Sequence, residues 1–333
     1  MQPHDLVTIS DVAAQAGVST MTVSRVMNNR GAVKPETREA VLMAVEALGY
    51  APNAAARSLA SGGLDRIGLL YSNPSAGYLS EFLLGALEGV QANGGQLTVE
   101  QCDDDAQSEI AAVRRLAAGG IRGLLLPPPH GESIAILAEA ERLGLKVVAV
   151  APGAFRSQAI AVRIDDRAAA AEMTRRLLDL GHRRIGFISG SPNQTASAER
   201  LAGFCTEIDA RPDAEAMIEA GAFTYRSGLD AAARLLDRTD PPTAIFASND
   251  DMALGAIALA HQRRLDVPGA LTVVGFDDTP MATAVWPALT TVRQPIARMA
   301  AQAVALLVRS GEAPPETVFP HLLVERGTSA LRR

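Results

Sequence analysis

The side chains best suited to molecular recognition gather near the N-terminus, between residues 19 and 28. Arg25 can donate two parallel hydrogen bonds to guanine O6 and N7, while Thr20 and Met21 can contact a thymine methyl group. Hydroxyl groups nearby can hold phosphates. We therefore predict a DNA-contacting surface composed of Thr8, Ser19, Thr20, Met21, Thr22, Ser24, Arg25 and Asn28. A three-helix domain without this role is the alternative, because Lys and Arg only balance Asp and Glu over residues 1–61.

Three short helices are expected to position this surface. Thr8 followed by Asp11 resembles a capping box, and Gly17 suits the left-handed residue that ends a helix. Ser19 is a favourable N-cap for the second helix. Pro35 suits the first turn of a third helix, which Gly49 ends. Residues 1–50 are therefore predicted to form an all-α helix-turn-helix domain.

Residues 51–63 form a different segment, rich in Ala and Ser and ending in Gly62 and Gly63. Asn53 could cap a short helix that runs through Ala60. A helix this short is marginal in water, because isolated helices below about 12–15 residues are rarely stable. The segment is therefore predicted to be disordered or to need a partner, and the two glycines that follow indicate a linker; an inert linker throughout is the alternative.

From Arg66 onward, short apolar runs alternate with amphipathic helical stretches. Strands alternating with helices indicate parallel sheets. There are enough units for two α/β lobes: an N-lobe of about 64–163 plus 295–322, and a C-lobe of about 164–294 plus 323–333. Ligands in such folds bind beyond the carboxyl ends of the strands, so the cleft between the lobes is the expected site.

Composition excludes several classes of protein. The net charge of −6 provides no overall basic field for nucleic acid, so DNA contact must be local. Cys102 and Cys205 are far apart and the five His are scattered, which argues against a metal site or a disulfide scaffold. The acidic run 103–105 is expected to be a solvated loop. We expect no cofactor.

The sequence also lacks signals for export and catalysis. No basic segment followed by an apolar run begins the chain, and no apolar run approaches the ~20 residues that span a bilayer. There is no dinucleotide fingerprint, P-loop or nucleophile elbow. We therefore expect a cytoplasmic protein that is neither an enzyme nor bound to a membrane.

Several motifs in order resemble one family. They are TISDVAAQAGVSTMTVSRVMNN, VKPETREAVLMAVEALGYAPNAAARSLAS, DLGHRRIGFISG, RLAGF, PPTAIFASNDDMALGAI, LTVVGFDD and LTTVRQP. Together they resemble the lactose/galactose repressor (LacI/GalR) family of transcription regulators over essentially the whole chain. The resemblance implies a helix-turn-helix head, a hinge helix and a core of two Rossmann-like lobes similar to a periplasmic sugar-binding protein.

The resemblance also implies roles for individual residues. In the hinge it implies that the segment folds on DNA and enters the minor groove, with Leu59 as the wedge that unstacks a base step. The hinge residues expected at DNA are Asn53, Ala56, Arg57 and Leu59. Arg200, Asn249 and Asp277 match the family's effector-binding positions.

Other residues are expected at the effector site on different grounds. As strand-end residues, Tyr71, Ser72 and Asn73 should line the near lobe, and Phe223 and Trp286 are candidate stacking platforms. Phe223 could instead be a core residue.

Some polar residues near the cleft have alternative roles. Asp250 could cap the following helix, Asp278 could cap a loop, and Asp165 and Asp166 could be caps or contacts near the lobe crossover. This chain also has Ala151 where some sugar-binding members carry Asp. The effector is therefore expected to be oriented differently or to be something other than a simple monosaccharide.

These observations predict a homodimeric repressor of carbohydrate-utilisation genes. It would bind a pseudo-palindromic operator in double-stranded DNA and be released by a sugar or oligosaccharide. Effector would close the lobes, change the dimer interface and prevent the two hinge segments from pairing. A corepressor-activated regulator that binds a nucleobase or another small metabolite is the alternative, and a sugar-binding transport protein is the alternative of a different class.

Overall fold

A computed structural model describes most of the chain. The described ranges are residues 7–27, 33–50, 66–103, 105–152, 159–309 and 311–332. The chain divides into two compact units, residues 1–63 and residues 64–333, and each unit has a hydrophobic core of its own. Asn28, Asn53, Ala56, Arg57 and Leu59, together with the predicted hinge helix, lie outside the described residues.

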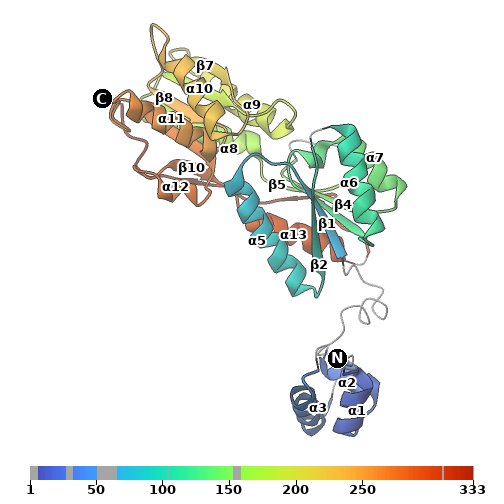
Figure 1. Ribbon diagram of the computed structural model, residues 1–333. Coiled ribbons are helices and arrows are strands. Elements are labelled where there is room, and N and C mark those ends of the chain that lie inside the picture. The colour runs from blue at the N-terminus through green and yellow to red at the C-terminus, as the bar shows by residue number, and fades with distance from the viewer. Residues whose placement is uncertain are drawn as a thin grey trace. The chain divides into compact units, whose positions relative to one another are not determined.

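The first unit is a set of three helices: α1 (Ile9–Ala16), α2 (Thr20–Met27) and α3 (Pro35–Leu48) (Figure 1). Their inward faces share one small core, which consists of Val12, Ala13, Val23, Val26, Val41 and Ala44. The short turn between α1 and α2 gives the helix-turn-helix arrangement that the sequence predicted.

Local capping fixes the ends of these helices. The Thr8 hydroxyl accepts a hydrogen bond from the Asp11 amide, and the Asp11 carboxylate accepts one from the Thr8 amide at 2.8 Å. Gly17 ends α1 with φ of 64°, a conformation that glycine adopts without steric cost. The Ser19 hydroxyl accepts from the Thr22 amide at 3.2 Å and begins α2. Each of these caps was predicted from the sequence.

The second unit contains two six-stranded sheets. The N-lobe sheet is parallel throughout and consists, in spatial order, of β11 (Glu316–Val318), β5 (Ile160–Arg163), β4 (Lys146–Val150), β3 (Gly123–Leu126), β1 (Arg66–Tyr71) and β2 (Gln96–Gln101). The C-lobe sheet consists of β12 (Leu322–Val324), β10 (Thr290–Arg293), β9 (Thr272–Asp277), β8 (Ala244–Ala247), β6 (Arg184–Ser189) and β7 (Glu215–Ala220). Only the pairing of β12 with β10 is antiparallel.

Helices cover both faces of each sheet (Figure 1). The N-lobe helices are α5 (Ala76–Ala92), α6 (Ala106–Ala118), the 3₁₀ turn η1 (His130–Glu132), α7 (Ile134–Arg142) and α13 (Ile296–Val308). The C-lobe helices are α8 (Asp166–Asp179), α9 (Thr195–Asp209), α10 (Tyr225–Leu236), α11 (Asp250–Gln262) and the short α12 (Met281–Ala284). In the N-lobe α5 packs on α13 so closely that a Cβ at Gly85 would lie 2.0 Å from the Ala297 carbonyl oxygen.

The chain crosses between the lobes three times. It passes from β5 to α8, from β10 to α13, and from β11 to β12. Within the described ranges, no helix combines the length and apolar character needed to cross a bilayer.

Candidate functional site

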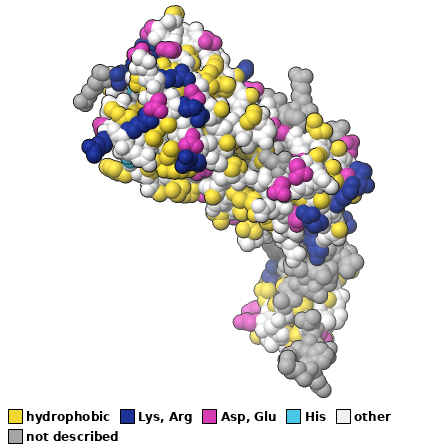
Figure 2. Space-filling view, turned by 45° about the horizontal axis from the view of Figure 1, so that its top comes forward, with side chains coloured by type: hydrophobic (Ala, Val, Ile, Leu, Met, Phe, Trp, Pro, Cys, Tyr) yellow, Lys and Arg dark blue, Asp and Glu magenta, His cyan; other side chains and the backbone are white. Residues whose placement is uncertain are grey.

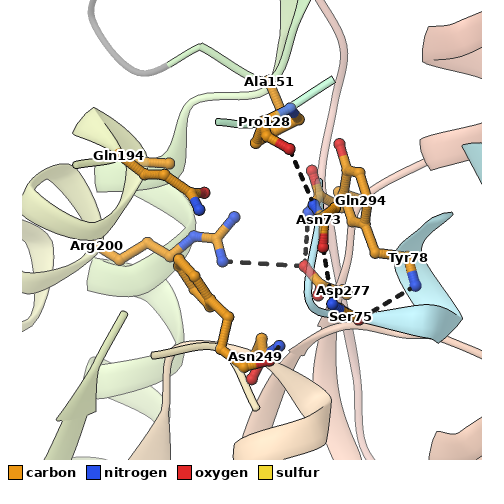
Figure 3. Close-up of a pocket in the computed structure, with 12 residues that line it drawn as sticks. Asn73, Ser75, Tyr78, Pro128, Ala151, Gln194, Arg200, Asn249, Asp277 and Gln294 are labelled. Carbon is orange, nitrogen blue, oxygen red and sulfur yellow. Dashed lines mark hydrogen bonds and ion pairs between the residues drawn. The ribbon is translucent and has the colours of Figure 1, made fainter. Parts of the chain in front are cut away.

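A pocket lies between the two lobes, where the loops after several strands meet (Figure 3). Its N-lobe wall consists of Asn73, Ser75, Tyr78, Pro128 and Ala151. Its C-lobe and crossover wall consists of Gln194, Ala196, Arg200, Phe223, Asn249, Asp277 and Gln294. Five residues predicted to bind effector therefore line one pocket, namely Asn73, Arg200, Phe223, Asn249 and Asp277. Their role in binding stays a prediction.

Arg200 occupies the centre of the C-lobe wall. Its Nε donates to Asp166 Oδ1 at 2.8 Å, and its Nη1 donates to the Ser248 carbonyl oxygen at 2.6 Å. Nη1 also lies 3.9 Å from Asp277 Oδ1. The guanidinium carbon lies 3.7 Å from the centre of the Phe276 ring, within cation–π distance. Arg200 therefore stabilises the lobe as well as facing the pocket.

Two buried carboxyl groups, Asp166 and Asp277, lie beside this guanidinium, and a third, Asp250, interacts with Asp277. Burial raises the pKa of Asp277 to about 7, although Arg200 and the Gln294 amide oppose the rise. Burial also raises the pKa of Asp166, although Arg200 opposes the rise. Burial and the nearby Asp277 together hold the pKa of Asp250 well above its usual range. The wall can therefore take up or release a proton near neutral pH.

Two polar atoms of the lining lack a partner among the described residues: the Tyr78 hydroxyl oxygen and Gln294 Oε1, both buried. Gln294 uses its other end to donate to Asp277 Oδ1 at 2.6 Å. Burial raises the pKa of the Tyr78 phenol, so its proton stays available for donation. Because a buried polar group without a hydrogen bond is costly, a ligand that bonds to both atoms would gain affinity.

Backbone strain also concentrates at this pocket. Five non-glycine residues of the described chain have positive φ, and three of them line the pocket: Ala151 at 49°, Phe223 at 58° and Asp277 at 117°. Such conformations cost about 1–3 kcal/mol each and persist where the surrounding structure imposes them, often at ligand sites.

The two predicted amide side chains hold loops in place. Asn73 donates from Nδ2 to the Pro128 carbonyl oxygen at 3.2 Å and accepts from the Ser75 amide at 2.8 Å. Asn249 accepts from the Met252 amide and donates to the Phe223 carbonyl oxygen at 3.1 Å. Both side chains thus shape the pocket through these bonds.

Asn249, and not Asp250, is the N-cap of α11. The suggestion that Asp250 caps this helix is therefore wrong. The Asp250 carboxylate accepts instead from the Thr279 amide at 2.7 Å and the Thr291 hydroxyl at 2.6 Å, and so joins the loop after β9 to strand β10.

Three residues predicted at the effector site do not line the pocket: Tyr71, Ser72 and Trp286. Trp286 is 85% exposed, beyond the end of α12. Phe223 lines the pocket and also belongs to the core beneath it, and its stacking role stays a prediction.

Two other carboxylates whose roles the sequence left open, Asp165 and Asp278, bond to groups of the protein itself. Asp165 caps α8 through a hydrogen bond from the Ala168 amide at 2.9 Å. Asp278 forms ion pairs with Arg293 and Arg326, at 2.6 and 2.7 Å.

Direct contacts bridge the lobes beside the pocket. On one side, the Thr195 amide, at the start of α9, donates to Glu132 Oε2 at 2.9 Å, and the Thr195 hydroxyl donates to the same oxygen. Gln194, the N-cap of α9, makes no side-chain capping bond, so Glu132 supplies the cap from the other lobe. On the other side of the pocket, Ser75 of the N-lobe is hydrogen-bonded to Asp251 of the C-lobe. Burial raises the pKa of the Asp251 carboxyl group, and this hydrogen bond opposes the rise.

The pocket is open at one side. The space that its lining residues leave between them, including this mouth, is about 370 Å³.

In the head, the outer face of α2 is accessible. Met21 is 64% exposed, and Thr20 and Arg25 are also exposed. The hydroxyl groups of Ser19 and Thr22 lie 2.9 Å apart and bond to each other. Thr20, Met21 and Arg25 are therefore the predicted DNA contacts that the fold leaves most available; the roles of the predicted set stay predictions.

On the face of the second unit drawn in Figure 2, basic and acidic side chains lie close together over the C-lobe. The C-lobe contains ion pairs such as Arg234 with Glu219 and Arg183 with Asp213. Among the described residues, no three His, Cys, Asp or Glu side chains are placed to hold a metal ion.

Comparisons with known proteins match both units. Residues 8–53 match the model described as "Bacterial regulatory proteins, lacI family", and residues 174–329 match "Periplasmic binding protein-like domain". Catabolite control protein A of Priestia megaterium is 34% identical over 311 residues, which cover 91% of this chain and 92% of that protein.

Two solved structures are similar over nearly the full length. A complex of the transcriptional regulator CelR with cellobiose has 30% identity and a TM-score of 0.74, with 97% of this chain and 100% of that chain covered. A lac repressor dimer bound to operator and the anti-inducer ONPF has 26% identity and a TM-score of 0.77, with 98% and 100% covered. One of these similar proteins holds a sugar and the other holds DNA.

Proposed function

This chain belongs to the lacI family of bacterial regulatory proteins and is a DNA-binding transcription regulator, and we propose that a carbohydrate in the interlobe pocket controls its binding to an operator. The pocket chemistry carries this proposal. Arg200 and Asp277 present a guanidinium and a carboxyl group side by side, and Tyr78 and Gln294 add unpaired polar atoms. Such groups suit adjacent sugar hydroxyls, which both donate and accept.

The position of the pocket suggests how the effector acts. Its walls belong to different lobes, so a ligand held by both walls changes the lobe spacing that Glu132 and Thr195 fasten. Closure of the lobes on the effector is the change that we propose. It is a shift between two lobe arrangements, one of which favours operator binding.

Operator binding falls to the head, and a homodimer supplies two heads. A recognition helix reads only a few bases, so two copies on a pseudo-palindromic site gain both affinity and specificity. The similar lac repressor structure is a dimer on its operator. We infer that Thr20, Met21 and Arg25 read base edges here, with the hinge and its Leu59 wedge bending the duplex.

The sign of the response and the effector class define the alternative function. A nucleobase would also use the Asp277 and Gln294 hydrogen bonds, and it would act as a corepressor if it favoured the operator-binding arrangement. We propose a repressor released by a sugar, acting in the cytoplasm and without catalytic activity, because the similar proteins are transcription regulators.

A thermal-shift screen of sugars, oligosaccharides and nucleobases tests the proposal. A ligand at about 100 times its Kd should stabilise the core by about 2.7 kcal/mol. Asp277→Asn should remove most of the shift, whereas the neighbouring Asp278→Asn, which alters a carboxylate paired with Arg293 and Arg326, should keep it. A full shift in Asp277→Asn would place the effector elsewhere, and a response to nucleobases alone would favour the alternative.

A further inference from the structure

A second polar cluster lies at the carboxyl edge of the N-lobe sheet, outside the pocket lining. Cys102 follows β2, Glu109 is on α6, His130 begins η1, and Ser133 caps α7. Cys102 Sγ lies 3.4 Å from His130 Nε2, and His130 Nδ1 lies 3.3 Å from Glu109 Oε1. The Ser133 hydroxyl donates to Glu109 Oε2 at 2.6 Å. Thiol, imidazole and carboxylate thus form one hydrogen-bonded series.

The hydrogen bonds determine where the protons lie. A carboxylate only accepts, so the Glu109 oxygen requires a proton on the His130 nitrogen that faces it, Nδ1. The other ring nitrogen, Nε2, then presents its lone pair to the Cys102 sulfur. This is the arrangement of a thiol, its general base and a group that orients the base.

From this geometry we propose that Cys102 is a modification site, at which a hydroperoxide oxidises the thiol to a sulfenic acid. Thiolate is the reactive form of cysteine, and a neighbouring His favours it by taking the proton. Cys102 is 5% exposed, between the exposed residues Gln101 and Asp103, so only a small oxidant would reach it. Hydrogen peroxide meets that requirement.

The proposed step balances as follows. His130 Nε2 takes the thiol proton, and the thiolate attacks one oxygen of hydrogen peroxide. An S–O bond forms and the O–O bond breaks. Sulfur loses two electrons, the peroxide gains them, and the leaving hydroxide takes the proton from His130 to become water. The products are the Cys102 sulfenic acid and one water molecule.

Oxidation here would be felt at the effector pocket, and this part of the inference rests on the proposed function. The added oxygen enters a close-packed site, so His130 must move. His130 is two residues from Pro128, which lines the pocket and accepts the Asn73 hydrogen bond. Oxidised protein should therefore show a weaker thermal shift with effector, and Cys102→Ser should show none of this sensitivity to peroxide.

The chain contains its own control, Cys205. Cys205 is more accessible than Cys102, and burial and the nearby Asp209 raise the pKa of its thiol. Accessibility alone would therefore favour Cys205, whereas the His130 relay favours Cys102. Full-length protein should be treated with hydrogen peroxide for set times and then unfolded in the presence of a 1,3-dione, so that the trap reaches both cysteines equally. After digestion, mass spectrometry gives the rate at which each cysteine peptide becomes labelled.

We expect Cys102 to react about tenfold faster than Cys205, and Glu109→Gln to slow Cys102 by about tenfold, as the loss of an assisted proton transfer predicts. Faster labelling of Cys205, or an unchanged rate in Glu109→Gln, would overturn the modification site. The comparison of the two cysteines needs no variant, so it holds even if Glu109→Gln fails to fold. A normal effector shift in oxidised protein would overturn only the link to the pocket.

Discussion

Replacing Arg200 with Met should destabilise the core, because it removes the guanidinium that is bonded to Asp166 and faces Asp277. Both carboxyl groups are buried and lie 2.8 and 3.9 Å from Arg200. Removing one partner of a buried ion pair costs about 3–5 kcal/mol. At about 2.1 cal/mol/K per residue, a unit of about 270 residues unfolds with an entropy near 0.6 kcal/mol/K. The Tm should therefore fall by about 5–9 °C.

The loss should depend on pH. Arg200 lowers the pKa of Asp166 and Asp277, in opposition to burial. When Arg200 is lost, the pKa of each carboxyl group therefore rises further above its value in the unfolded chain. Such a group contributes stability that is lost as pH rises from the unfolded value toward the folded one. The deficit of Arg200→Met should therefore be larger at about pH 8 than at about pH 5.5, which calorimetry at both values would reveal.

Arg175 provides a matched control on the same pair of helices. It joins α8 to α9 through Glu207 at 2.6 Å, but its side chain is 52% exposed. Exposed pairs contribute about 0–1 kcal/mol, so Arg175→Met should lower the Tm by less than about 2 °C at either pH. Equal losses in the two variants, or a deficit in Arg200→Met that does not change with pH, would refute the view that Arg200 compensates buried carboxylates.

Three further predictions concern the pocket, the lobe contact and the head. Because burial raises the pKa of Asp277 to about 7, the contribution of Asp277 to stability should fall as pH rises from about 4 to about 7. Effector affinity, measured by titration calorimetry, should also vary near pH 7 in the parent protein but not in Asp277→Asn. Glu132→Gln should weaken the cap on α9, and such caps contribute about 0.5–2 kcal/mol to helix stability. Amide hydrogen exchange at Thr195 should therefore become about twofold to thirtyfold faster. An unchanged rate would show that this contact does not hold the helix. Arg25→Ala should cost about 1–3 kcal/mol of binding to the selected operator and little on scrambled duplex; equal losses on both would make Arg25 a phosphate contact.

The parts of the fold that local chemistry determines could be predicted from sequence. The ends of the head helices depend on neighbouring residues, such as Thr8 with Asp11, the turn residue Gly17 and the cap Ser19. The alternation of buried strands and helices likewise follows from patterns within short windows, and so the two sheets could be anticipated.

The pocket could be predicted only in part. Asn73 was expected because it stands at a strand end, where ligand sites of α/β folds lie. Asp277 was expected because it matches an effector-binding position of the family that the sequence resembles, and both residues line the pocket. Tyr78 and Gln194 were missed because they line the pocket from α5 and from the start of α9, and only the packing of two lobes brings them together. Gln294 stood in the quoted segment LTTVRQP, at the end of β10, and that position was a usable signal.

Contacts between distant segments stayed beyond the sequence for the same reason. Glu132 and Thr195 are 63 positions apart and belong to different lobes, so no local pattern relates them. The relay of Cys102, Glu109 and His130 likewise depends on where a strand, a helix and a loop converge. Isolated residues in a sequence gave no reason to group them.

Linkage between the two ligands tests the central claim most directly. Operator affinity should be measured by fluorescence anisotropy with and without the effector identified by thermal shift, and effector affinity should be measured with and without operator. If occupancy of the interlobe pocket controls DNA binding, each ligand must change the affinity for the other by the same factor, typically about 5–150-fold. An operator affinity that is the same with and without saturating effector would contradict the account.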